Sequence, residues 1–151
     1  MTTFVLVHGA FGSSAELAPV IPELEALGHR AIAVDLPCTD PAATLDDYAR
    51  TVVATMAGIA GPVVVVGHSA GGATISLVPA RTRVDRLVYV TAVVPEPGRS
   101  IVDAAGGRAY SKSSASAVIY RSILFAIGSA QLTAIDGLYL SPEGWMPEAV
   151  R

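Results

Sequence analysis

The 151-residue sequence has few side chains that can bind a metal or form a disulfide. It has three histidines, His8, His29 and His68, and one cysteine, Cys38. A single cysteine cannot form an internal disulfide, and we therefore expect a reducing, cytoplasmic location. The four residues are scattered and match no zinc-ligand spacing, so we expect no metal site. Cys38 is interpreted as a small apolar side chain in a loop rather than as a reactive thiol.

The sequence also has few charges. Only 15% of its residues are charged, and 10 basic against 13 acidic residues give a net charge of −3 with no basic block. This balance argues against nucleic acid and anionic membrane surfaces as partners. The N-terminus lacks the basic and long apolar segments of a signal peptide. Residues 115–132 are apolar, but Arg121 lies near their middle, which favours a buried or partner-facing helix over a membrane span.

Nucleotide-binding motifs are absent as well. Residues 67–72 are rich in glycine but lack the Gly-Lys-Ser/Thr of a phosphate-binding loop. Residues 8–12 do not match G-x-G-x-x-G, the pattern of dinucleotide-binding turns. We therefore expect no cofactor.

The central motif runs from residue 63 to residue 72. Four consecutive valines, Val63 to Val66, predict a strand that is buried on both faces, as in a parallel sheet. They lead into Gly67-His68-Ser69-Ala70-Gly71, a G-x-S-x-G pattern, and then into a helix-compatible segment. Strand, sharp turn and helix in this order indicate that Ser69 occupies a strained turn at the carboxyl edge of the sheet. The alternative is a glycine-rich turn without catalytic function.

The rest of the first hundred residues alternates between strands and helices. Apolar runs predict further strands at 4–7, 30–34 and 86–90. Helical spacing of apolar residues runs from Leu17 to Leu27, and Leu45, Tyr48, Val52 and Met56 predict the buried stripe of a second helix. Thr44 begins that helix with a capping box that has Asp47 in the usual place of glutamate. The order βαβαβαβ favours parallel pairing.

Three motifs together resemble the α/β-hydrolase superfamily. They are His8-Gly9-Ala10 after the first strand, Val34-Asp35-Leu36-Pro37 after the second, and Gly67-His68-Ser69-Ala70-Gly71-Gly72 after the third. The resemblance covers about residues 3–100 and is greatest to the branch that contains plant methylesterases, hydroxynitrile lyases and bacterial esterase-like proteins. It implies a three-layer α/β sandwich with strand order 2-1-3-4, the N-terminal half of the family fold.

The same resemblance implies how the chain is divided. Residues 1–151 form one domain, with residues 1–100 as its core and residues 101–151 as a truncated cap segment. The elements that normally cover the core are then missing. An exposed sheet edge would result, and we expect the chain to self-associate through it.

The resemblance also implies a site for a small ester-like substrate. Ser69 would be the nucleophile, and the N–H groups of Ala10 and Ala70 would form the oxyanion hole. Gly9, Phe11 and His68 would line the substrate pocket.

One required residue is absent from this sequence. In this family the order along the chain is nucleophile, acid, histidine, but no histidine follows Ser69. The positions of His8, His29 and His68 do not suit them to replace the missing histidine. Glu96 and Asp103 follow the fourth strand, where some hydrolases have the triad acid, but we interpret them as turn residues. The sequence therefore predicts an impaired serine esterase. The alternatives are a non-catalytic remnant that binds a small molecule, and a hydroxynitrile lyase, which needs the same histidine.

Overall fold

Four parallel strands form the sheet of the computed structural model, which describes residues 1–94. The strands are β1 (Thr3–Val7), β2 (Arg30–Val34), β3 (Val63–His68) and β4 (Arg86–Val90), in the spatial order β2-β1-β3-β4. Thr3 pairs with Arg30 on one side and with Val63 on the other, so β2, β1 and β3 begin level with one another. This confirms the predicted strand order. The expected cap over 101–151 lies outside the described residues.

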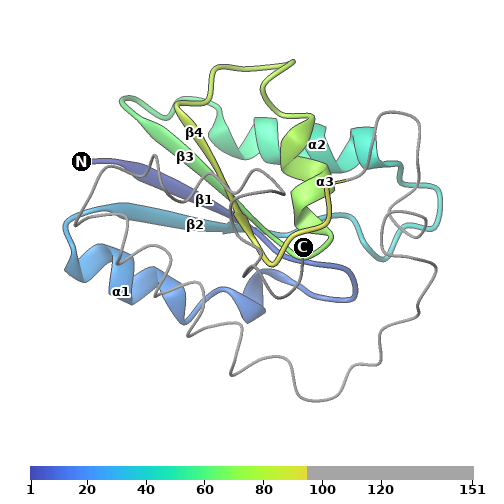
Figure 1. Cartoon of the computed structure of the whole chain (residues 1–151), viewed down its shortest axis with the longest axis horizontal. Helices are drawn as coiled ribbons and strands as arrows, with labels where there is room; N and C mark the ends of the chain where they lie inside the picture. The colour runs from blue at the N-terminus through green and yellow to red at the C-terminus, as the bar shows by residue number, and fades with distance from the viewer. Residues whose placement is uncertain (95–151) are drawn as a thin grey trace, which may run out of the picture.

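The helices cover both faces of the sheet. They are α1 (Val20–Ala26), which follows the short 3₁₀ helix η1 (Ser14–Glu16), α2 (Leu45–Met56) and α3 (Gly71–Ser76). Figure 1 shows α1 on one side of the sheet, with α2 and α3 on the other. The predicted α/β class with three layers is therefore confirmed. Among residues 1–94, no helix has both the length and the apolarity needed to cross a bilayer.

Alternating side chains of the strands form two separate cores. Phe4 and Leu6 of β1 pack on the α1 side, whereas Val5 and Val7 pack against α2 and α3. The four valines of β3 divide in the same way, and all are buried. A strand that is covered on both faces favours apolar side chains at successive positions, which explains the uninterrupted valine run.

Local sequence signals set the helix ends. Pro22 lies in the first turn of α1, where its missing N–H leaves no hydrogen bond unmade. Gly28 ends α1 with a φ of +80°, a conformation that favours glycine. One expectation needs correction: the fully buried side chains of α2 are Ala49, Val52 and Met56, whereas Leu45 and Tyr48 are only partly buried. Tyr48 lines a cavity, and this leaves its side chain partly uncovered.

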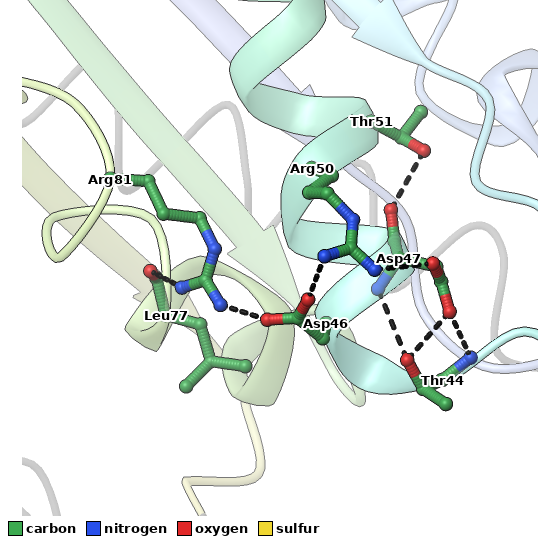
Figure 2. Close-up of polar contacts among 7 residues, drawn as sticks. All are labelled: Thr44, Asp46, Asp47, Arg50, Thr51, Leu77 and Arg81. Atoms are coloured by element: carbon green, nitrogen blue, oxygen red, sulfur yellow. Dashed lines mark hydrogen bonds and ion pairs between the residues drawn. The ribbon is translucent and has the colours of Figure 1, made fainter.

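Ion pairs tie the start of α2 to the end of α3 (Figure 2). The Arg81 guanidinium donates to the Leu77 carbonyl at 2.6 Å, where α3 ends, and also to the Asp46 carboxylate. Asp46 pairs in addition with Arg50 one turn further along α2. Two helices that are distant in sequence are thus held together at the solvent side of their contact.

The predicted capping box is present and gives a stability prediction. The Thr44 side chain accepts from the Asp47 N–H at 3.3 Å, and the Asp47 carboxylate accepts from the Thr44 N–H at 2.8 Å. Thr44→Ala should lower the free energy of unfolding by about 1 kcal/mol, because an N–H of the first turn loses its acceptor. Urea denaturation of the full chain measures this.

Thr51→Ala is the matched control. The Thr51 hydroxyl only adds a second bond to the Asp47 carbonyl within the same helix (Figure 2), and alanine is the better helix former. Equal destabilisation by both substitutions would contradict a special role for the cap.

Candidate active site

Ser69 occupies a strained turn between β3 and α3. Its φ is +52°, in the left-handed region that non-glycine residues seldom adopt. The Ser69 N–H donates to the Val90 carbonyl at 3.1 Å, and the Ser69 carbonyl accepts from the N–H groups of Gly72 at 3.1 Å and Val93 at 2.8 Å. The end of β4 therefore holds the turn, which agrees with the geometry that G-x-S-x-G predicts.

Close backbone contacts explain the glycines beside Ser69. A Cβ on Gly67 would lie 2.8 Å from the Gly71 carbonyl oxygen, and a Cβ on Gly71 would lie 2.7 Å from the carbonyl oxygens of Val7 and His8. A Cβ on Gly9 would lie 2.9 Å from Cβ of Ser69. The loop after β1 and the turn after β3 thus pack backbone against backbone, as the sequence predicts for these two segments.

A cavity of about 240 Å³ opens beside this contact. Its three walls come from the loop after β1, from the β2–α2 connection with the first turns of α2, and from the start of α3. The first wall has His8, Gly9, Ala10 and Phe11, the second has Leu36, Cys38 and Tyr48, and the third has Ala70, Gly71 and Thr74. Phe11 is 75% exposed and has a φ of +62°, which places it at the rim.

The cavity brings together four of the predicted site residues. Gly9, Ala10, Phe11 and Ala70 line it, whereas the part of its lining that the structure describes includes neither Ser69 nor His68. Ser69 directly precedes Ala70, which lines the cavity. His68 is buried and lies beside Gly9. The catalytic and oxyanion roles stay predictions.

His8 has a structural role in this arrangement. Its ring is 1% exposed, and Nε2 accepts from the Leu36 N–H at 3.2 Å. A backbone N–H can only donate, so the ring proton must be on Nδ1, which donates to the Gly9 carbonyl at 2.8 Å. Both ring nitrogens are therefore engaged. His8 links the β1 and β2 loops and has no lone pair free to activate Ser69.

The other two histidines do not form a catalytic pair with Ser69 either. His68 is 8% exposed, and its Nδ1 has no hydrogen-bond partner within residues 1–94. His29 contacts the Phe4 ring, with the ring centroids 5.2 Å apart, and precedes β2 at the amino end of the sheet. Ser69 follows the carboxyl end, roughly 17 Å away along five strand residues. Among the described residues, no hydrogen bond joins Ser69 Oγ to a histidine.

Burial of His68 gives a prediction of pH dependence. Burial lowers the pKa of its imidazole, and the neighbouring His8 lowers the pKa further. Below about pH 6.5 the unfolded chain binds a proton at His68 that the folded chain does not bind. The free energy of unfolding should therefore fall between pH 7 and pH 5, by at most about 1.4 kcal/mol per pH unit.

Urea denaturation at several pH values measures this effect. Hydrogen bonds lower the pKa values of Asp35, Asp47 and Asp85. The stability that these carboxylates contribute is therefore lost only below about pH 5, so it does not affect the change measured between pH 7 and pH 5. His68→Gln should flatten the profile, whereas the control His29→Gln should leave the His68 contribution in place. An unchanged slope in His68→Gln would contradict the assignment.

The acidic residues after β2 support loops. Asp35 Oδ1 accepts from the Ser14 N–H at 2.8 Å, and Asp40 Oδ1 accepts from the Ala42 N–H at 2.9 Å. The bond from Ser14 is the main cause of the lowered pKa of Asp35. In the described part of the chain, no three histidine, cysteine or acidic side chains gather as metal ligands do.

The second wall of the cavity does not follow from the local sequence. The local pattern predicts only a loop at Leu36 and Cys38 and a buried position in a helix for Tyr48. A signal was present, because loops that follow parallel strands meet at the carboxyl edge of the sheet. The β2 loop follows a strand adjacent to β1, so its residues were bound to lie near the loop after β1.

The strained serine turn after a central parallel strand defines an α/β-hydrolase-type site, and comparison with known proteins agrees with it. The model of the alpha/beta hydrolase family matches residues 4–149. The chain belongs to this family.

Similar proteins include hydrolases of esters and related compounds. The chain is 36% identical to a pyrethroid hydrolase of Sphingobium wenxiniae over 65% of its own length and 38% of the relative. It is 34% identical to methylesterase 2 of Arabidopsis thaliana over 64% of its length and 41% of the relative. The crystal structure of an extracellular α/β-hydrolase from a Paenibacillus species superposes with a TM-score of 0.63 at 26% identity, over 68% of this chain and 46% of that one. The chain thus spans about 40% of the length of the curated relatives that it matches.

Proposed function

We propose that this chain is a serine hydrolase of the carboxylesterase type that acts on small ester substrates through Ser69. The observation that carries the proposal is the left-handed turn at Ser69, packed against the loop after β1. Ala10 and Ala70 line the same cavity, and their amide N–H groups are the proposed donors for a developing oxyanion. The names of the relatives, among them a methylesterase and a pyrethroid hydrolase, support this substrate class.

Catalysis by this chain alone is proposed to be impaired. A serine hydroxyl is a weak nucleophile until a base removes its proton. His8 uses both ring nitrogens within the loops, and no histidine follows Ser69 in the sequence. The proposed reaction requires no cofactor. The cytoplasmic location stays a prediction.

Mapping of a covalent adduct tests the role of Ser69. After prolonged incubation of the full chain with a fluorophosphonate, peptide mass spectrometry should find the adduct on Ser69 and none in Ser69→Ala. Ser76 serves as an internal control, because it lies in α3 and its hydroxyl contacts the Gly72 carbonyl and the Tyr89 hydroxyl. An adduct spread equally over both serines would argue against a nucleophilic site.

A non-catalytic binder is the second candidate. It is favoured by the engagement of His8 and by the lack, within residues 1–94, of any histidine bonded to Ser69. Such a protein would keep the cavity and show no adduct at Ser69 at any incubation time.

Self-association is also proposed, through the outer edge of β4. This strand ends the sheet order, so no strand pairs with its outer side among residues 1–94. Unpaired edges present backbone N–H and C=O groups to a second chain. Light scattering after size-exclusion chromatography should show a mass that rises with concentration. A constant monomeric mass over a hundredfold range would contradict the proposal.

A further inference from the structure

The cavity extends from the proposed oxyanion amides to the β2–α2 connection. Ala10 belongs to the wall from the loop after β1, and Ala70 to the wall from the start of α3. Leu36, Cys38 and Tyr48 form the wall between β2 and the first turns of α2. The bond from the Leu36 N–H to His8 Nε2 fixes this wall relative to the loop after β1. A molecule whose carbonyl oxygen lies at the two amides therefore has continuous space toward α2.

The chemistry of the walls restricts what this space accepts. Within residues 1–94, the residues that line it include no aspartate, glutamate, lysine or arginine. The His8 ring engages both nitrogens elsewhere, so it presents carbon atoms. Transfer of a charged group to such a site is costly because no counter-charge faces it. The walls thus select an uncharged group.

The size of the cavity and its polar groups restrict the ligand further. Its volume of about 240 Å³ lies below the roughly 300–1,000 Å³ of ordinary ligand pockets. The hydroxyl of Tyr48 lies within hydrogen-bonding reach of Cys38, and this contact, together with burial, raises the pKa of Tyr48 to about 12. The phenol therefore stays neutral and occupies part of the wall.

We propose that this space is the acyl pocket of the ester substrate, that it accepts short uncharged acyl groups, and that Cys38 and Tyr48 are the specificity-determining residues that limit their length. The assignment of the acyl group rests on the proposed function; the binding of a small uncharged molecule here does not.

Cys38 itself supplies a direct readout. It is exposed and is the one cysteine of the chain, so alkylation by iodoacetamide reports on the cavity without background. Methyl butanoate should slow this reaction about tenfold at ten times its Kd, because only the unoccupied fraction reacts. β-Alanine methyl ester has the same number of non-hydrogen atoms but ends in an ammonium group instead of a methyl group, and it should give no protection. Absence of protection by methyl butanoate, or equal protection by both, would overturn the proposal.

Substitution of the wall tests the length limit. Cys38→Trp should raise the Kd of methyl butanoate at least about tenfold, or 1.4 kcal/mol, by ligand-observed NMR. The control Glu25→Trp, at an exposed position of α1 on the other side of the sheet (Figure 1), should leave it unchanged. Tyr48→Trp replaces Cys38→Trp if that variant loses its native circular dichroism. An unchanged Kd in folded Cys38→Trp or Tyr48→Trp would contradict the assigned wall.

The two proposals fail in different ways. Protection of Cys38 should persist in Ser69→Ala, since binding does not need the nucleophile. Protection without any adduct at Ser69 would refute the hydrolase and retain the pocket. An adduct at Ser69 without protection of Cys38 would support the hydrolase and refute the proposed acyl pocket.

Discussion

Gly71→Ala should lower the free energy of unfolding by about 3 kcal/mol, the upper part of the range for overpacked interiors. The new Cβ would lie 2.7 Å from the carbonyl oxygens of Val7 and His8. Both atoms belong to the backbone at the end of β1, the strand that pairs on both sides in the sheet. Neither can move without separating α3 from β1. Urea denaturation of the full chain, followed by circular dichroism, measures the loss.

Gly12→Ala is the matched control. Its Cβ would meet only the carboxylate end of Glu16, a flexible side chain. The unfolding free energy should therefore change little. If the two glycines proved equally tolerant, the backbone contact between α3 and β1 would not hold the site together.

Labelling of Ser69 by a fluorophosphonate should be slow, and imidazole should accelerate it. The members of a catalytic triad act as a unit, and an oxyanion hole with binding alone leaves roughly 10³–10⁴-fold acceleration over water. Since both ring nitrogens of His8 are hydrogen-bonded within the loops, we expect added imidazole to act as the general base. For the same reason, Ser69→Ala should change the slow hydrolysis of p-nitrophenyl acetate little.

The acceleration must depend on Ser69. Imidazole hydrolyses activated esters without protein, so the readout is the Ser69 adduct in the full chain, with Ser69→Ala as background. A base of similar strength but larger size, such as N-ethylmorpholine, should accelerate labelling less. Rapid labelling without imidazole would mean that another group of the assembled protein already activates the serine.

The strands and the serine turn were predictable because short-range sequence patterns determine them. The Val63–Val66 run predicts a strand covered on both faces, and both faces are covered. Gly67 and Gly71 predicted a crowded turn, and the Cβ contacts show why. These features depend on neighbours within a few residues.

The parts that the sequence did not reveal depend on distant neighbours. Nothing near Ser69 indicates that the end of β4 holds its backbone through Val90 and Val93. The neutral tautomer of His8 depends on Leu36, 28 positions away. The contribution of Cys38 and Tyr48 to the cavity likewise depends on how the β2–α2 connection returns to the sheet.

The parallel sheet has a consequence for how this chain folds. Thr3 of β1 pairs with Arg30 and with Val63, which lie 27 and 60 positions further along. During synthesis β1 is made first, yet its second partner leaves the ribosome only after sixty more residues. Contacts of such long sequence separation slow folding and prolong the exposure of unpaired strands. We therefore expect the apolar residues of β1 (Thr3–Val7) to stay without their β3 partner on the nascent chain until β3 has been made.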